Sequence, residues 1–190
     1  MVSLRSTATD ALANLSLPDV QGRPHRIGDL WADGPVVLCF VRHFGCIFCR
    51  AQASELDAWR DEIRARGARL VIVGNGASRY AEAFAEDLKI QSTILIDEQR
   101  HSYQAAGMRR GFTEILSPKL PWNALRSYLA GHRQSSVQGD AFQLGGVLVV
   151  APGARIVYEY ISESGGDHPA PQAILNALGG DSDAGQTKAA

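Results

Sequence analysis

The chain has 190 residues, 45% apolar and 21% charged, and its 19 basic and 20 acidic side chains leave a formal net charge of −1. This length fits one domain, and the balanced charge argues against the basic surface that nucleic acid or an anionic membrane would require. The longest apolar stretches are only as long as strands, and the first residues lack the basic start and apolar run of a secretory signal. We therefore expect a single-domain cytoplasmic protein.

The first third of the chain predicts a hairpin, a buried strand and a helix. Residues 1–13 are expected to be a flexible leader, loose or weakly helical, and residues 15–27 contain a glycine and a proline where a short hairpin would turn. Residues 36–41 form an unbroken apolar run of branched and aromatic side chains, which predicts a buried strand. Residues 49–63 repeat apolar side chains at helical spacing, which indicates a helix with one packed face.

The remaining elements continue an alternation of strands and helices. We expect a strand at 69–74, a helix at 79–88, a strand at 93–97, a short helix at 102–106, a further helix at 122–129, a hairpin of 147–150 with 155–160, and a closing helix at 171–178. This order predicts an α/β protein with a thioredoxin-like fold, in which helices flank both faces of a central mixed sheet. The domain would span residues 14–178, followed by a disordered tail at 179–190.

Cys46 and Cys49 are the residues best placed for chemistry. They lie three positions apart at the predicted start of a helix, where the unpaired backbone N–H groups and the helix dipole favour a thiolate. A structural zinc site would need four ligands, and the chain has one such pair with only scattered histidines, so we expect no metal. Cys39 lies within the predicted strand and is expected to be an inert core thiol.

Cys46 and Cys49 are expected to have different roles in the reaction. Cys46 should be the more exposed and act as the nucleophile, while Cys49, a turn further into the helix, would resolve the intermediate by forming the Cys46–Cys49 disulfide. An external thiol or dithiol would then restore both sulfurs. The helical spacing turns Gln52 and Glu55 away from the packed face.

Three basic side chains flank the thiols, and a nearby cation would lower a thiol pKa. His43 is the best candidate for tuning Cys46 or for hydrogen-bonding the substrate oxygen, although it could equally cap the turn or face solvent. Arg42 and Arg50 are candidates for substrate binding, with a solvated surface position as the alternative for Arg50. These assignments make residues 42–50 the predicted centre of the site.

Three segments of the chain resemble the peroxiredoxin-like branch of the AhpC/TSA antioxidant family. They are residues 40–50, 139–147 and 164–168, and the resemblance extends over about residues 14–178. It implies a thioredoxin fold and a thiol-based reduction of a peroxide, or of a lipid endoperoxide such as prostaglandin H in some relatives. It also implies a thioredoxin- or glutathione-type reductant and no bound cofactor.

The chain departs from the peroxiredoxin pattern at the positions that bind peroxide. In the Pro-x-x-x-Thr/Ser-x-x-Cys motif, Cys39 takes the place of the proline and His43 the place of the hydroxyl residue. The cis-proline expected in thioredoxins is replaced by the segment 143–146. Gln143 could offer its amide to the substrate. Gly145 and Gly146 would let the backbone pass close to the sulfur site, with an ordinary tight turn as the alternative.

Asp167 and His168 lie in a glycine-rich loop, which could be a polar cluster beside the substrate or an ordinary solvent loop. Three functions remain open for the thiol pair. The first is a thiol peroxidase or reductase acting on a small oxidised molecule; the second is a protein disulfide oxidoreductase; the third is a redox sensor that uses the disulfide as a switch. We also leave open whether the chain forms a homodimer.

Overall fold

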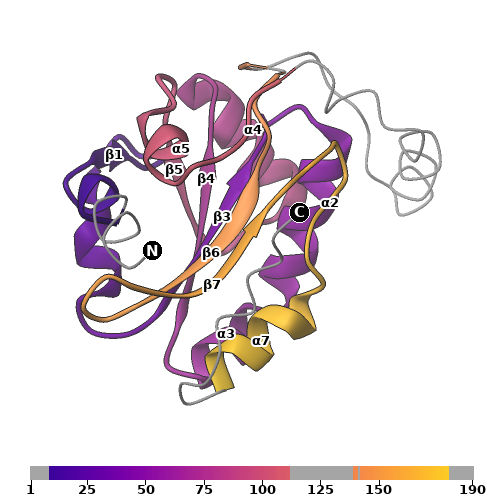
Figure 1. The fold of residues 1–190 in the computed structure, drawn as a ribbon. Helices are drawn as coiled ribbons and strands as arrows, with labels where there is room; N and C mark the ends of the chain where they lie inside the picture. Colours follow the sequence, from indigo (N-terminus) through magenta and orange to yellow (C-terminus); the bar gives the residue numbers. More distant parts are fainter. Residues whose placement is uncertain (1–8, 112–138, 141, 180–190) are drawn as a thin grey trace.

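The computed structural model describes residues 9–111, 139–140 and 142–179, and it is built around a five-stranded mixed sheet (Figure 1). The sheet order is β5-β4-β3-β6-β7. Its strands are β3 (Val36–Val41), β4 (Arg69–Gly74), β5 (Thr93–Ile96), β6 (Gly146–Ala151) and β7 (Arg155–Ile161). β3, β4 and β5 are parallel, whereas β6 pairs antiparallel with both β3 and β7. The predicted central mixed sheet is therefore confirmed.

Elements pack on both faces of the sheet, as expected from the sequence. One face carries α2 (Ile47–Ala58), α3 (Arg60–Ala65), α4 (Ser78–Leu88) and α7 (Pro171–Gly179). The other carries the 3₁₀ helix η1 (Ile27–Trp31), α5 (His101–Ala105) and the antiparallel hairpin of β1 (Ser16–Pro18) and β2 (Pro24–Arg26). No helix in the described part of the chain is long and apolar enough to cross a membrane.

The central strand β3 supplies both cores because its side chains alternate between the two faces. Val37, Cys39 and Val41 pack against the α2 side, and Val36, Leu38 and Phe40 pack against the η1 side. All six are fully buried, which explains why the sequence of this strand shows no polar alternation. Residues 42–46, directly beyond the end of this strand, are buried as well.

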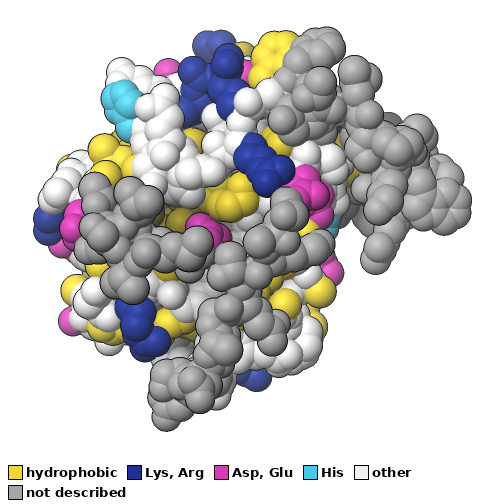
Figure 2. All heavy atoms as spheres, in the orientation of Figure 1, with side chains coloured by type: hydrophobic (Ala, Val, Ile, Leu, Met, Phe, Trp, Pro, Cys, Tyr) yellow, Lys and Arg dark blue, Asp and Glu magenta, His cyan; other side chains and the backbone are white. Residues whose placement is uncertain are grey.

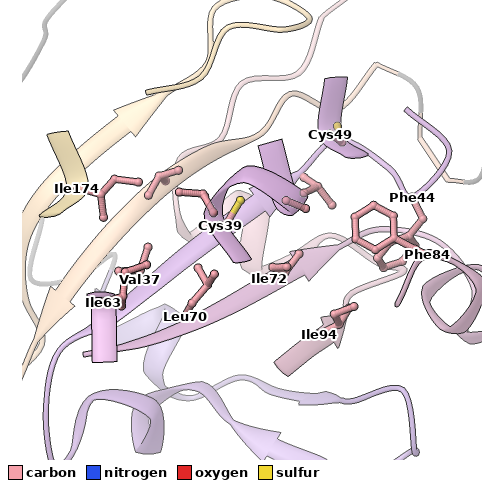
Figure 3. Close-up of a cluster of buried hydrophobic side chains, with 14 of the residues drawn as sticks. Val37, Cys39, Phe44, Cys49, Ile63, Leu70, Ile72, Phe84, Ile94 and Ile174 are labelled. Atoms are coloured by element: carbon pink, nitrogen blue, oxygen red, sulfur yellow. The ribbon is translucent and has the colours of Figure 1, made fainter. Parts of the chain in front are cut away.

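Figure 3 shows the core on the α2 side, where Cys39 lies among the labelled side chains of the sheet. Burial raises the pKa of Cys39 to about 12, so this thiol stays protonated and unreactive at neutral pH. Cys49 lies in the same cluster, at its edge, on the helix that follows β3. The core therefore extends up to the thiol pair.

The described structure differs from the sequence-based expectations in three places. Residues 9–13 are helical, which is one of the two forms expected for a loose or weakly helical leader, but Leu12 is only 1% exposed, so this part is packed onto the domain. The helix expected at 49–63 is interrupted at Trp59, where φ is −93° and ψ is 10°, and this divides it into α2 and α3. Gln52 is buried, against the expectation that it turns away from the packed face.

Two other expectations fall wholly or mostly outside the described residues. The helix expected at 122–129 lies outside the described residues. The same is true of the expected tail beyond its first residue, which is the last residue of α7.

Candidate active site

The thiol pair lies where β3 passes into α2. Cys46 occupies the position before the first helical residue, with extended backbone angles of φ −74° and ψ 123°. Its N–H donates to the carbonyl of His43 at 3.2 Å, which closes a tight turn. Two side chains from other segments stabilise this turn. Asn75 Nδ2 donates to the carbonyl of Arg42, and the Tyr103 hydroxyl donates to the carbonyl of Val41 at 2.6 Å.

Cys46 carries the more acidic thiol of the pair. A hydrogen bond from the Cys49 side chain, the positive charge of Arg42 and backbone N–H groups of the first helical turn lower its pKa to about 6, against the opposing effect of burial. The guanidinium Nη1 of Arg42 lies 3.8 Å from the Cys46 sulfur. Cys46 is therefore mainly a thiolate at neutral pH.

Cys49 behaves in the opposite way. Burial raises its pKa well above the ordinary thiol value, and the hydrogen bond to Cys46 and the charge on that sulfur act in the same direction. The backbone N–H of Arg42 donates to the Cys49 sulfur at 3.2 Å. One thiolate and one thiol thus lie within hydrogen-bonding reach, which suits a nucleophile and a resolving thiol.

The physical reason for this division differs from the one expected from the sequence. We expected Cys46 to be the exposed thiol, but Cys46 is 2% exposed and Cys49 is 3% exposed. Exposure therefore does not distinguish the two sulfurs. Their different neighbours do, because Cys46 accepts the hydrogen bond of the pair and lies beside the Arg42 guanidinium.

His43 is not the cation of the site. It is only 3% exposed, and burial together with the neighbouring charge of Arg42 lowers its pKa to about 4. The imidazole is therefore neutral at pH 7 and cannot stabilise a thiolate by its charge, which corrects one of the roles we expected for it. Its Nδ1 is buried without a hydrogen-bond partner, so a role in hydrogen bonding to a substrate oxygen remains a prediction.

Gln143 positions Arg42 instead of offering its amide to a substrate. The amide Nε2 donates to the backbone carbonyls of Arg109 at 3.0 Å and Leu144 at 2.9 Å, which uses both of its hydrogens. The backbone carbonyl of Gln143 accepts a hydrogen bond from Arg42 Nε at 3.3 Å. This contact joins residues 101 positions apart and directs the guanidinium toward the sulfurs.

Arg50 lies in an interhelical ion pair. Its Nη2 is 2.9 Å from Asp87 Oδ2 on α4, and its guanidinium lies 5.8 Å from the centre of the Phe84 ring. The side chain is 13% exposed, so it is not the solvated surface arginine that the sequence left open. Its contacts in the structure link α2 to α4, and its expected role in substrate binding stays a prediction.

The two predicted glycines both allow close backbone approach, but at different places. A Cβ atom on Gly145 would lie 2.1 Å from the carbonyl oxygen of Phe40, at the end of β3 beside the thiols. A Cβ atom on Gly146 would lie 2.4 Å from the carbonyl oxygen of Tyr160 and 2.7 Å from the sulfur of Met108. Only Gly145 therefore brings the backbone close to the sulfur site.

A small hollow, partly open to solvent and with room for about one water molecule, lies on the Cys49 side of the site. Its wall is formed by Phe40, Arg42, Phe48, Cys49, Gln52, Gly145, Ser162, Ser164, Gly166, Asp167 and His168. The glycine-rich loop that the sequence left ambiguous thus borders the thiol site. Sequence reasoning missed Gln52 and Ser162 in this wall, because their positions depend on how α2 and the end of β7 meet.

The described residues contain no group of three or more His, Cys, Asp and Glu side chains that could hold a metal ion. Charged side chains of both signs are interspersed over the face shown in Figure 2, apart from the atoms drawn in grey. Within the described site, two sulfurs lie side by side, and the Arg42 guanidinium contacts the Cys46 sulfur while the Arg42 backbone N–H donates to the Cys49 sulfur.

Replacing Arg42 with methionine should shift the pH dependence of Cys46. Because the guanidinium lowers the pKa of Cys46, its removal is expected to raise that pKa by about one unit from its value near 6. Below both midpoints the rate of peroxide oxidation should fall about tenfold, and well above both midpoints the two proteins should converge. Stopped-flow oxidation across a pH series measures this.

The matched control for that experiment is Arg64→Met, which removes an arginine that is 75% exposed and paired with Asp61. It should leave the midpoint near pH 6 unchanged. An unchanged midpoint in Arg42→Met would show that its guanidinium does not tune the thiol.

The fold and the site together define a thiol-dependent oxidoreductase of the thioredoxin-fold class. A family model described as AhpC/TSA antioxidant enzyme matches residues 55–164, a range that begins beyond the thiol pair. The thioredoxin-like protein AAED1, chloroplastic, of Arabidopsis thaliana is 34% identical over 177 residues, which is 88% of this chain and 71% of the relative. The chain therefore belongs to the AhpC/TSA antioxidant enzyme family, and the resemblance noted in the sequence is confirmed.

Two further similarities agree with this assignment. The prostamide/prostaglandin F synthase of Danio rerio is 31% identical over 183 residues, covering 94% of this chain and 89% of the relative. The crystal structure of peroxidoxin BcpB from Mycobacterium tuberculosis superposes with a TM-score of 0.66 at 22% identity, covering 89% of this chain and 94% of that one. The thioredoxin-like fold is thus confirmed, and the protein is a peroxiredoxin-like enzyme.

Proposed function

We propose that this protein reduces a peroxide or an endoperoxide-type substrate with the Cys46 thiolate, and that Cys49 resolves the product as an intramolecular disulfide. The observation that carries the proposal is the placement of two neighbouring sulfurs in different surroundings: the Arg42 guanidinium lies 3.8 Å from Cys46, and the backbone N–H of Arg42 donates to Cys49 at 3.2 Å. The pKa of Cys46 is lowered to about 6 and the pKa of Cys49 is raised. A reactive thiolate therefore stands next to a thiol that supplies the second electron pair and a proton.

The reaction balances with these two residues. The Cys46 thiolate attacks one peroxide oxygen, the O–O bond breaks, and the released alkoxide takes up a proton to give an alcohol or water. Cys46 is then a sulfenic acid, and attack by the Cys49 sulfur forms the disulfide and releases water. With a cyclic endoperoxide, Cys46 would instead hold the opened substrate as a sulfenate ester until Cys49 displaces it as a diol.

The burial of both sulfurs favours a small substrate over a protein disulfide. In thiol–disulfide exchange the attacking thiolate must touch a sulfur of the other protein, and Cys46 and Cys49 are only 2% and 3% exposed. A disulfide held on a folded protein would have to open this site before it could react. A peroxide group needs far less room, so burial supports the peroxidase function among the alternatives that the sequence left open.

Stopped-flow measurement of thiolate oxidation tests the proposal. The reduced protein is mixed with hydrogen peroxide, with a bulky lipid hydroperoxide, and with insulin as a protein disulfide. We expect one of the peroxides to react fastest and the product to have lost two hydrogen atoms by mass spectrometry. Faster reduction of insulin would instead favour a protein disulfide oxidoreductase. A reversible disulfide with no turnover of any oxidant would favour a sensor.

A thioredoxin- or glutathione-type reductant is part of this proposal, and such a reductant too would need the site to open before it could reach the Cys46–Cys49 disulfide. The cytoplasmic location and a homodimer stay predictions. The A. thaliana relative is named as chloroplastic, and that location refers to the plant protein alone.

A further inference from the structure

Tyr103 is a fully buried tyrosine on α5, and its ring packs edge-on against that of Phe40 at 5.2 Å. α5 covers the face of the sheet opposite to α2, so Tyr103 and the thiols belong to different sides of the sheet (Figure 1). The hydroxyl nevertheless reaches the carboxyl ends of two neighbouring strands. It donates to the carbonyl of Val41 at 2.6 Å and lies 2.9 Å from the carbonyl oxygen of Val73.

The Val41 carbonyl belongs to the same peptide unit as the backbone N–H of Arg42. That N–H donates to the Cys49 sulfur at 3.2 Å. Because the peptide unit is planar and conjugated, a hydrogen bond to its oxygen strengthens its N–H as a donor. One hydrogen-bonded chain therefore runs from the Tyr103 hydroxyl, through this peptide unit, to the sulfur of Cys49.

The position of α5 is fixed by Asp97, a buried carboxylate directly after β5. Asp97 accepts hydrogen bonds from the N–H of Ser102 at 2.7 Å and from the N–H of His101 at 3.2 Å. The Ser102 hydroxyl donates to the same carboxylate at 2.5 Å. A helix of five residues has few hydrogen bonds of its own, so these contacts determine where α5 begins and where Tyr103 lies.

Cys49 has to carry negative charge at one point of the proposed reaction. Its thiol must lose a proton before the sulfur attacks the Cys46 sulfenic acid; the S–S bond then forms, the S–O bond breaks, and the released hydroxide takes up a proton to give water. Burial opposes this ionisation, because it raises the pKa of Cys49 well above the ordinary thiol value. The hydrogen bond from the Arg42 N–H favours the charged sulfur, since hydrogen bonds to ionised acceptors are the stronger ones.

The Tyr103 phenol stays protonated during this step. Burial raises the pKa of Tyr103 well above the ordinary tyrosine value, and negative charge on Cys49 acts in the same direction. The hydroxyl therefore supplies its hydrogen bond both before and after Cys49 is ionised. Because a phenol has one hydrogen and this one goes to a backbone carbonyl, Tyr103 acts on Cys49 through the peptide unit.

We propose that Tyr103 is a positioning residue for the resolving step. Its hydroxyl orients and polarises the peptide unit between Val41 and Arg42, and the N–H of this unit stabilises the Cys49 thiolate that attacks Cys46. The inference rests on the proposed function for the role of Cys49. The first oxidation uses the Cys46 thiolate, so an effect of Tyr103 is expected on the second step and not on the first.

The variant Tyr103→Phe removes the hydroxyl and keeps the ring. Reduced protein is mixed with a series of hydrogen peroxide concentrations at pH 8, well above the Cys46 pKa of about 6, then quenched with acid, alkylated and weighed by mass spectrometry. Formation of the sulfenic acid is first order in peroxide and formation of the disulfide is independent of it, so one series gives both rate constants. We expect the rate constant for disulfide formation to fall about fivefold, the size typical of one hydrogen bond, and that for oxidation to stay within about twofold.

Two variants control for changes in packing and stability. Tyr80→Phe removes the hydroxyl of a partly buried tyrosine on α4 and should leave both rate constants unchanged. Val150→Ala weakens the buried cluster that contains Tyr103 and should lower the melting temperature without slowing disulfide formation. Equal slowing of both steps in Tyr103→Phe, or the same slowing of disulfide formation in Val150→Ala, would overturn the proposal.

The hydrogen-bonded chain is also testable without peroxide, which separates this inference from the proposed function. The backbone N–H resonance of Arg42 is recorded by NMR in the reduced wild-type protein and in two variants. A hydrogen bond to sulfur moves this proton downfield, so the resonance should move upfield in Cys49→Ala and, by a smaller amount, in Tyr103→Phe. An unchanged resonance in Tyr103→Phe would contradict the inference whether or not the protein reduces peroxide. If the shift occurred but the wild-type protein consumed no peroxide, the proposed function would fail and the hydrogen-bonded chain would stand.

Discussion

Replacing Cys46 with serine is expected to abolish peroxide reduction, with the rate constant for oxidation falling on the order of 10³-fold or more. A serine hydroxyl stays protonated where the Cys46 thiol, with its pKa near 6, is ionised, and the reaction loses its nucleophile. Stopped-flow oxidation of wild type and variant under the same conditions measures the loss. Peroxide consumption at the wild-type rate by Cys46→Ser would exclude this residue as the nucleophile.

Variants of Cys49 distinguish its role as the resolving thiol from its effect on the pKa of Cys46. In Cys49→Ser the hydroxyl can still donate to the Cys46 sulfur, so the first oxidation should continue, but the sulfenic acid should persist because no disulfide can form. In Cys49→Ala the hydrogen bond is also lost, and the pKa of Cys46 should rise. The control Cys39→Ala should retain both steps, because Cys39 is buried away from this chemistry with a pKa of about 12.

Replacing Phe84 with alanine is expected to cost about 3–5 kcal/mol of unfolding free energy, the range typical for a buried phenylalanine. Phe84 is 1% exposed on α4, and its ring lies edge-on to that of Phe44 at 5.3 Å. Figure 3 shows the two rings together beside the strands. The Phe44 ring in turn fills the space over Gly74, where an added Cβ would lie 2.3 Å away.

Guanidinium unfolding of the reduced proteins measures that loss. The matched control Phe142→Ala removes a phenylalanine that is 39% exposed, and it should change the free energy by no more than about 0.5 kcal/mol. Phe84→Leu should recover part of the loss because it refills most of the volume. A cost below about 1 kcal/mol for Phe84→Ala would mean that the ring pair does not anchor the turn before Cys46.

Elements with a regular local pattern were predictable from the sequence. The strands β3 and β4 have the predicted bounds, because a continuous apolar run bounded by turn residues is a local signal. The break between α2 and α3 was not predictable in this way. Trp59 carries the same apolar spacing as its neighbours, and its packing against the core on the α2 side is a property of the assembled domain.

The electrostatics of the site show more clearly what local sequence cannot predict. His43 and Arg42 both precede the thiols in the sequence, and we expected His43 to be the residue that tunes the pKa of Cys46. In the structure, burial leaves His43 neutral with a pKa of about 4, and Arg42 reaches the Cys46 sulfur. The contact that directs Arg42 comes from the backbone of Gln143, which no local pattern could indicate.

The sequence by itself determined the thiol pair, its place between a buried strand and a helix, and the family to which the chain belongs. These properties depend on residue identity and on spacing along the chain. Only the tertiary structure decided why Cys46 and not Cys49 is the ionised sulfur, which cation stabilises it and which residues lie around Cys49. Each of these depends on burial and on contacts between distant segments, because a pKa responds to what surrounds a group in space and not to its neighbours in sequence.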